Sequence, residues 1–144
     1  MAKVISSIDI AAPADRIFGV IREPRTLADL WPSLETVNNV RLMREGEGSS
    51  YSWVCTMGGE RFTGTAQVIE CVADRRYVVQ DRGDIESIRD IQLQPENGVT
   101  RCLVRIEYTA PLPPCGQLDE AVLLREHERG LDTFLQNLKT RLEA

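Results

Sequence analysis

Very short connections between strand-like runs constrain the fold of this chain more than any other feature of its sequence. Residues 35–109 hold six runs rich in β-branched and aromatic residues, separated by turns of a few residues. Gly58-Gly59 and Asn97-Gly98 are typical of tight hairpins, because glycine and asparagine tolerate positive φ angles. Parallel neighbours need long crossovers, so these connections predict antiparallel pairing. The sequence therefore predicts a six-stranded meander at 35–44, 50–57, 61–71, 77–82, 85–94 and 99–109.

The segment before the meander predicts a further strand and two short helices. Lys3–Ile10 is short and rich in β-branched residues, as strands are. Pro13 suits the first position of a helix, because its missing N–H is not needed there. That helix of about two turns ends at Glu23-Pro24, since proline disrupts a helix interior. A second short helix at 25–30 closes at Trp31-Pro32, because a proline disfavours helical geometry in the preceding residue.

The C-terminal run from Gln117 to Leu142 predicts one long helix. At 1.5 Å per residue it would be roughly 40 Å long. Leucines at 124, 131, 135, 138 and 142 form one apolar stripe. The run holds one glycine, Gly130, which costs about 1 kcal/mol relative to alanine in a helix. We expect Gly130 to mark a bend or a close approach to another element.

A single helix cannot cover six or seven strands of a flat sheet, so we expect the sheet to curl around it. Gly64 lies inside a strand, where glycine permits sharp bending. Bulky side chains at 134–138 would fill the space under the downstream half of the helix. The upstream half, around Leu123 and His127, would stand off from the sheet and leave a pocket. A completely packed core is the alternative, because strand alternation shows burial and not emptiness.

Strand alternation indicates which residues would line the pocket. Three strand faces are mainly apolar and carry tyrosine or tryptophan tips that can form a hydrogen bond. A tyrosine would orient a carbonyl or hydroxyl group and Trp53 would stack on a flat ring, with ordinary packing as the alternative for each. The predicted ligand-binding residues are Tyr51, Trp53, Cys55, Phe62, Ala66, Arg89, Val104, Ile106, Tyr108, Leu123, Leu124 and His127.

His127, the only histidine in the chain, is the predicted catalytic residue. It lies at the edge of the apolar stripe, which aims it toward the pocket. An unperturbed imidazole has a pKa of about 6.5, which suits general acid–base work. The alternative, which this position favours, is a histidine that forms a hydrogen bond at the rim of the pocket.

Arg89 has two possible orientations. It is in phase with Ile85 and Ile91, which would point it inward to pair with an acid or a ligand anion. The adjoining Glu86 and Asp90 instead favour an outward salt bridge.

Charge and cysteine usage exclude several function classes. With 22 acidic and 17 basic residues the net charge is -5, whereas nucleic-acid binders usually carry a basic surplus or stripe. The N-terminus lacks signal-peptide anatomy, and no stretch approaches the roughly 20 apolar residues of a membrane span. We therefore expect a cytoplasmic protein. The four cysteines contain no C-x-x-C pair, so we expect reduced thiols, no metal site and no cofactor.

The order of these elements resembles the helix-grip fold of the START/Bet v 1-like (SRPBCC) superfamily. Ile8-Asp9-Ile10-Ala11-Ala12-Pro13-Ala14-Asp15-Arg16-Ile17-Phe18 is similar to its opening strand, Ala-Pro turn and first helix. Leu30-Trp31-Pro32 is similar to the end of its second helix, and Gly64–Val68 lies in an expected strand. The resemblance implies a single α+β domain over 1–144, with a seven-stranded curved antiparallel sheet around the C-terminal helix.

The resemblance, closest to the bacterial polyketide cyclase/dehydrase and lipid-transport group, implies three classes of function. The first is binding or transport of a small hydrophobic or aromatic molecule. The second is an aromatase/cyclase or dehydratase in which His127 and a tyrosine polarise a carbonyl. The third is a protein-interaction module that uses the outside of the sheet. One histidine cannot supply the histidine pair of the metal-dependent ring-hydroxylating branch. A monomer and a homodimer both remain open.

Overall fold

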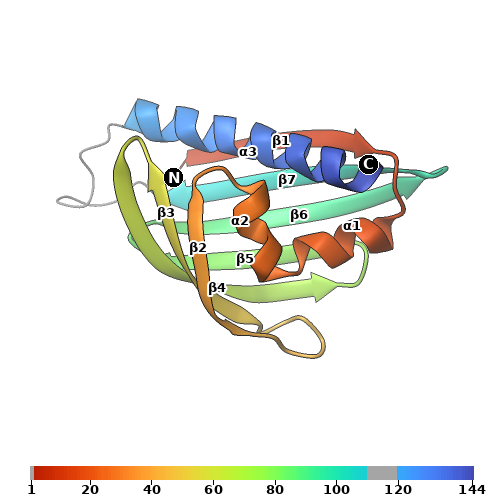
Figure 1. The fold of residues 1–144 in the computed structure, drawn as a ribbon, viewed down its shortest axis with the longest axis horizontal. Coiled ribbons are helices and arrows are strands. Elements are labelled where there is room, and N and C mark those ends of the chain that lie inside the picture. Colours follow the sequence, from red (N-terminus) through yellow and green to blue (C-terminus); the bar gives the residue numbers. More distant parts are fainter. Residues whose placement is uncertain (1, 110–119) are drawn as a thin grey trace.

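The computed structural model describes residues 2–109 and 120–144, and in these ranges it contains one seven-stranded antiparallel sheet. The strands follow the order β1-β7-β6-β5-β4-β3-β2, so the meander runs through six consecutive strands and β1 joins β7 at one edge (Figure 1). The predicted sheet and its pairing are confirmed. Its strands are β1 (Ala2–Ile10), β2 (Leu34–Arg41), β3 (Ser50–Met57), β4 (Glu60–Val72), β5 (Arg76–Gly83), β6 (Glu86–Glu96) and β7 (Val99–Thr109).

Two short helical segments and one long helix accompany the sheet. Helix α1 (Ala14–Ile21) follows β1, and η1 (Pro24–Thr26) runs directly into α2 (Leu27–Leu30), as the proline positions predict. The long helix α3 is described over Glu120–Glu143. The predicted start of this helix at Gln117, the preceding prolines and Cys115 lie outside the described residues.

The hairpin turns have the backbone geometry that their residues predict. Gly58 and Gly59 have φ angles of 57° and 83°, and Asn97 and Gly98 have 52° and 83°. Positive φ at both central residues matches the right-handed twist of the flanking strands. Strand β2 ends three residues earlier than predicted, at Arg41, which pairs with Ser50, the first residue of β3. Its register shifts near Asn39, whose φ is 54°.

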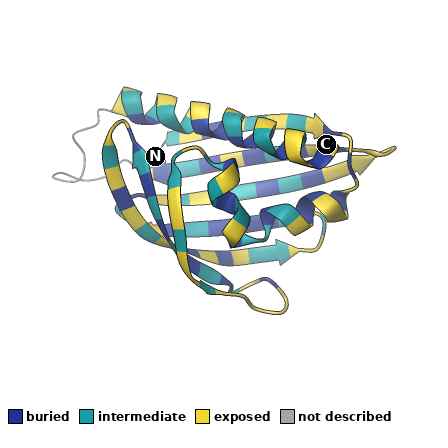
Figure 2. Ribbon diagram, viewed as in Figure 1, coloured by how far each residue is buried: buried dark blue, intermediate teal, exposed yellow. Residues whose placement is uncertain are grey.

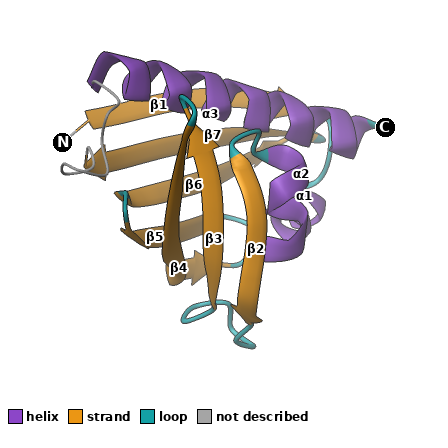
Figure 3. Ribbon diagram, turned by 60° about the vertical axis from the view of Figure 1, so that its left-hand side comes forward, coloured by secondary structure: helices purple, strands orange, loops and turns teal. Residues whose placement is uncertain are grey.

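The sheet bends where β3, β4 and β5 meet, and two glycines permit this. Gly64 lies opposite Trp53 on one side and opposite Gly83 on the other. A Cβ atom at Gly64 would lie 2.4 Å from Cζ2 of Trp53 and 2.5 Å from the carbonyl oxygen of Arg82. Figure 3 shows β2 and β3 running steeply across the direction of β1 and β7, so the sheet wraps around one side of α3.

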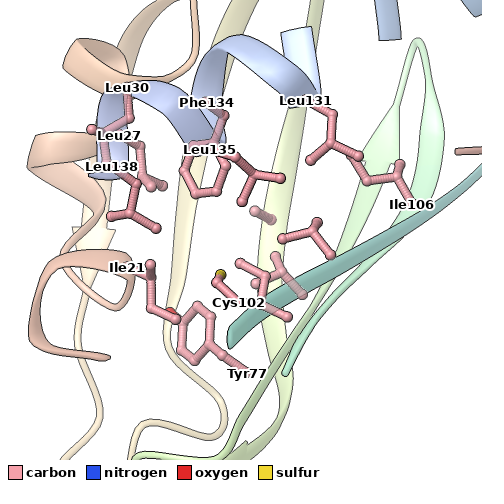
Figure 4. Packing of buried hydrophobic residues seen from close by; sticks show 14 of the residues in the cluster. Ile21, Leu27, Leu30, Tyr77, Cys102, Ile106, Leu131, Phe134, Leu135 and Leu138 are labelled. Atoms are coloured by element: carbon pink, nitrogen blue, oxygen red, sulfur yellow. The ribbon is translucent and has the colours of Figure 1, made fainter. Parts of the chain in front are cut away.

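The core lies between the sheet and the downstream half of α3. Phe134, Leu135 and Leu138 are fully buried, and they pack toward the short helices at Leu27 and Leu30 (Figure 4). Burying a side chain of this size stabilises the fold by about 1.5–3 kcal/mol. Figure 2 shows buried residues along the inner face of the sheet and exposed ones on the outer side of α3. The downstream half of α3 is thus the anchor that the bulky residues predict.

Polar contacts fasten α3 to the N-terminal elements. The Glu143 carboxylate accepts a hydrogen bond from the Ala11 backbone N–H at 2.8 Å. Lys139 donates to the Asp9 carbonyl oxygen at 2.7 Å, and Asn137 donates to that of Leu30 at 2.9 Å. These bonds fix the end of the helix against β1 and α2.

Candidate functional site: a cavity beneath the long helix

A cavity of about 110 Å³ lies between the upstream half of α3 and the sheet. The helix contributes Glu126, His127 and Gly130, and β3, β5, β6 and β7 contribute the facing wall. Trp31, which ends α2, closes one side. Of the two arrangements that the sequence allows, the structure has the open cavity.

The structure divides the predicted ligand-binding residues into two groups. The cavity is lined by six of them: Tyr51, Trp53, Cys55, Arg89, Ile106 and His127. The other six do not line it: Phe62, Ala66, Val104, Tyr108 and Leu123 are buried in the core, and Leu124 is half-buried. Alternation identified the inner face in each case. Alternation does not show how far the inner face lies from α3, and this distance decides whether a side chain lies in the core or on the cavity wall.

The sequence analysis missed several residues of the cavity wall, of which Asp81 and Ser87 matter most. Asp81 is in phase with the buried Tyr77 and Val79 on β5. Ser87 lies directly opposite Asp81 on β6 and is in phase with Arg89. The same period-two alternation would have found both, had polar residues been included.

Arg89 points into the cavity, so the outward salt bridge favoured by the sequence is wrong. Its Nε and Nη2 atoms donate to the Asp81 carboxylate at 2.8 and 3.0 Å, and Nη2 also donates to the Tyr51 hydroxyl at 2.7 Å. Ser87 donates to Asp81 at 2.6 Å. The next residue, Asp90, faces the other side of the sheet and forms the outward pair with Arg76 at 2.8 Å. Period-two alternation separates these neighbours.

This polar wall carries compensating charges. Burial lowers the pKa of Arg89, but the Asp81 carboxylate and the Tyr51 hydroxyl more than offset this, and the pKa lies above its ordinary value. Burial raises the pKa of Tyr51, which keeps the phenol neutral. Because Tyr51 accepts its hydrogen bond from Arg89, its own hydroxyl hydrogen stays available as a donor.

His127 is held in one orientation and one tautomer. Its ring stacks on Tyr108, with centroids 3.8 Å apart and planes inclined by 3°. Its Nδ1 atom lies 2.9 Å from the Leu123 carbonyl oxygen, which can only accept, so Nδ1 carries the hydrogen. Burial lowers the pKa of His127. The imidazole is therefore neutral at pH 7, and Nε2 carries a lone pair. The hydrogen-bonded histidine that the sequence allowed as an alternative is present at the cavity wall.

Two tryptophans on the cavity wall hold unpartnered donors. Trp31 stacks on Phe134, with centroids 4.1 Å apart, while Trp53 packs over Gly64. Within the described residues the buried Nε1 atoms of both indoles have no hydrogen-bond partner. Each unsatisfied donor costs about 1–3 kcal/mol.

Of the bend or close approach that the sequence predicts at Gly130, the close approach to another element is absent. A Cβ atom built there would meet no atom within 4 Å, apart from the neighbours in its own helix turn. Gly130 nevertheless is buried and lines the cavity. Its missing side chain therefore faces empty space.

Cys55, Cys71 and Cys102 are free thiols, and burial raises the pKa of Cys55 to about 12, which keeps that cavity thiol protonated. Across 2–109 and 120–144, no three His, Cys, Asp or Glu side chains gather in a way that would hold a metal ion. No helix in the described part of the chain is long and apolar enough to cross a membrane.

A match over almost the whole sequence shows the family of this chain. A profile of the family described as polyketide cyclase / dehydrase and lipid transport matches residues 1–143. The chain belongs to this family. The predicted resemblance is thereby confirmed. No curated protein matches the sequence.

Solved structures share the fold of this family member at low sequence identity. A protein of Thermus thermophilus matches with a TM-score of 0.82 and 20% identity, covering 98% of this chain and 97% of its own. The Zhui aromatase/cyclase of a Streptomyces species matches with a TM-score of 0.81 and 18% identity, covering 99% and 93%. A START superfamily protein of Mycobacterium smegmatis matches with a TM-score of 0.80 and 14% identity, covering 98% of this chain and 97% of its own. At these identities the likeness shows the helix-grip fold alone.

Proposed function

We propose that this protein binds or carries a small, uncharged hydrophobic or aromatic molecule in the cavity beneath α3. The observation that carries the proposal is a mainly apolar cavity in which the polar groups of β3, β5 and β6 compensate each other's charge. Trp53 and Ile106 supply apolar surface, whereas Asp81 already neutralises Arg89. An anionic ligand would lose its hydration there without finding a free counter-ion, because Arg89 is already paired with Asp81. Family membership supports the same class of function.

The polar wall supports a ligand that carries an oxygen acceptor. The Tyr51 hydroxyl can donate into the cavity because Arg89 satisfies its acceptor side. A carbonyl or hydroxyl oxygen beside Tyr51 would receive that hydrogen bond. Pockets for small molecules usually combine apolar walls with a few such polar groups. The cavity is smaller than the roughly 300–1,000 Å³ of drug-sized sites, so the ligand is compact.

Calorimetric titration with two probes of matched shape tests the proposal. We expect 2-naphthol to bind with one saturable site and 2-naphthoate, its carboxylate analogue, to bind at least tenfold more weakly. Native mass spectrometry of freshly purified protein would show any co-purified ligand directly. Absence of saturable binding by any neutral ring probe at millimolar concentration would refute the proposal.

A cyclase or dehydratase is the second candidate, and the pairing of a base with a donor in one cavity favours it. His127 Nε2 is unprotonated, as a base for a carbon-bound proton requires, and Tyr51 with Arg89 would polarise a carbonyl oxygen. In an aldol closure the carbon that loses its proton bonds to a second carbonyl carbon, and that oxygen takes up a proton. In the dehydration a second proton leaves the same carbon, a C=C bond forms, and the protonated hydroxyl group leaves as water.

Turnover assays separate the two candidates. A short β-polyketone thioester would be converted to a cyclic product by an enzyme but only bound by a carrier. If His127→Ala leaves turnover of a verified substrate unchanged, the catalytic role of His127 is excluded. A cavity filled by side chains would favour the interaction-module class, and the open cavity gives that class no such support. Cytoplasmic location and the choice between monomer and homodimer stay predictions of the sequence.

A further inference from the structure

The glycine in the middle of α3 has no structural partner that explains it. Gly130 lies ten residues into the described part of the helix, where glycine destabilises by about 1 kcal/mol relative to alanine. Its φ is not in the left-handed region, and a Cβ atom there would meet nothing within 4 Å. Neither a left-handed backbone conformation nor close packing requires glycine at this position.

Two aromatic stacks flank Gly130 on the same face of the helix. His127, three residues earlier, stacks on Tyr108 of β7, and Phe134, four residues later, stacks on Trp31. Residues three and four apart lie on one helix face, so these rings lie one turn to either side of the glycine. The planes within the two stacks are inclined by only 3° and 12°. Between them the cavity reaches the helix backbone.

We infer that Gly130 is a specificity-determining residue of this cavity, where its missing side chain leaves a slot for a flat one-ring or two-ring ligand lying against α3. A flat molecule fills the gap between two aromatic stacks with favourable contact at 4.5–7 Å between ring centroids, as aromatic pairs do. A saturated ring of equal carbon number is thicker and fits the gap poorly. The cavity of about 110 Å³ is of the same order as an engineered cavity of about 150 Å³ that holds benzene, so one ring fits inside, and the second ring of a two-ring ligand would extend toward the open side of the cavity. This inference rests on the proposed binding function and narrows its ligand class.

A matched pair of glycine substitutions tests the inference. Gly130→Ala places one methyl group in the slot, and we expect a higher Tm together with a loss of about tenfold in affinity for 2-naphthol. Gly130→Leu should abolish binding. Gly19→Ala is the control, because Gly19 also lies in a helix with open space around its Cβ position but lines a separate hollow beside Arg22 and Tyr77. It should raise Tm without changing affinity. On the unmodified protein, the saturated analogue trans-decahydro-2-naphthol should bind at least fivefold more weakly than 2-naphthol.

The outcomes separate this inference from the function on which it rests. If no neutral ring probe binds the unmodified protein, the proposed function itself fails. If 2-naphthol binds Gly130→Ala and the unmodified protein equally well, the inference is overturned while the binding function stands. Weaker binding by Gly19→Ala alone would place the ligand in the other hollow and would also overturn it. Equal affinity for the flat and the saturated probe would overturn the flat-ring class.

Discussion

At the scale of single residues, the buried ion pair of Asp81 and Arg89 shapes the polar wall of the cavity. Their side chains are only 9% and 15% exposed, so each charge depends on the other for the interactions that water would otherwise supply. Tyr51 and Ser87 complete the network from β3 and β6. Removal of one charged partner should therefore lower the free energy of unfolding more than the same removal from an exposed salt bridge.

Replacement of Asp81 by Asn should lower the free energy of unfolding by about 3–5 kcal/mol, because the Arg89 charge stays buried without a counter-charge. Urea denaturation followed by circular dichroism measures the loss. Asp90→Asn is the matched control on the outer side of the sheet, where its partner Arg76 is 43% exposed and the loss should stay under about 1 kcal/mol. Similar losses in the two variants would contradict a special role for the inner pair.

His127 should make stability depend on pH just below neutrality. Burial lowers its pKa in the folded state below the value of about 6.5 expected in the unfolded chain. Between these two pKa values the unfolded chain binds more protons than the folded one. The contribution of the neutral imidazole to the free energy of unfolding is therefore complete above pH 6.5 and is lost as the pH falls through the lowered pKa. We expect a smaller fall between pH 7.5 and 5.5 for His127→Gln, measured by urea denaturation at both values. Identical pH profiles would show that the imidazole titrates normally in the fold.

At the scale of elements, the contact between β3 and β4 shows how one residue without a side chain allows the sheet to bend. The Trp53 ring packs against Gly64, and the neighbouring Gly83 lets the backbones of β4 and β5 approach closely. The same residues place Trp53 on the cavity wall. The bend and the cavity therefore have a common cause.

Replacement of Gly64 by Ala should cost about 1–3 kcal/mol, because the new methyl group overlaps the Trp53 ring and the Arg82 carbonyl oxygen. Chemical denaturation gives the loss, and a change in tryptophan emission reports the displacement of the ring. Gly19→Ala, which meets no atom within 4 Å, serves as the control and should not lose stability. A Gly64→Ala protein as stable as the unmodified one, with unchanged emission, would rule out this account of the bend.

At the scale of the whole molecule, hydrogen bonds join the last turns of α3 to the backbone at the end of β1. Glu143 in the last turn of α3 accepts from the Ala11 N–H and pairs with Lys139, which in turn donates to the carbonyl oxygen of Asp9. The Leu142 side chain beside them is buried. This junction keeps α3 over the sheet, and with it the cavity beneath the upstream half of the helix.

Glu143→Gln should reduce the acid sensitivity of the whole fold. Hydrogen bonds from the Ala11 N–H and from Lys139 lower the pKa of Glu143, so its contribution is present above the ordinary value of 4.5 and is lost as the pH falls through the lowered pKa. We expect the Tm of the variant to lie below that of the unmodified protein at pH 6 and to approach it at pH 3. Scanning calorimetry at both values measures this. A constant difference in Tm at the two pH values would exclude the carboxylate as the cause.

The sequence predicted the helix-grip fold well, because that fold follows from local signals. Turn residues such as Asn97-Gly98 fix antiparallel pairing, and prolines bound the short helices. The apolar stripe of α3 predicts the residues that anchor it, Phe134 and Leu138 among them. Each of these signals acts over a few residues and needs no knowledge of distant contacts.

The cavity was predictable only in part, since period-two alternation shows which side chains face inward and not what they meet. Phe62 and Tyr51 both face inward, yet only Tyr51 lines the cavity. Arg89 was misjudged because its partner, Asp81, lies on the neighbouring strand and the acids beside it in sequence face the other way. Gly130 was expected to mark a bend or a close approach to another element, and in place of a close approach it faces empty space. The sequence by itself determined the elements and their pairing, through short-range propensities. Tertiary structure alone decided where the cavity lies, because an empty volume depends on the distances between elements far apart in the chain.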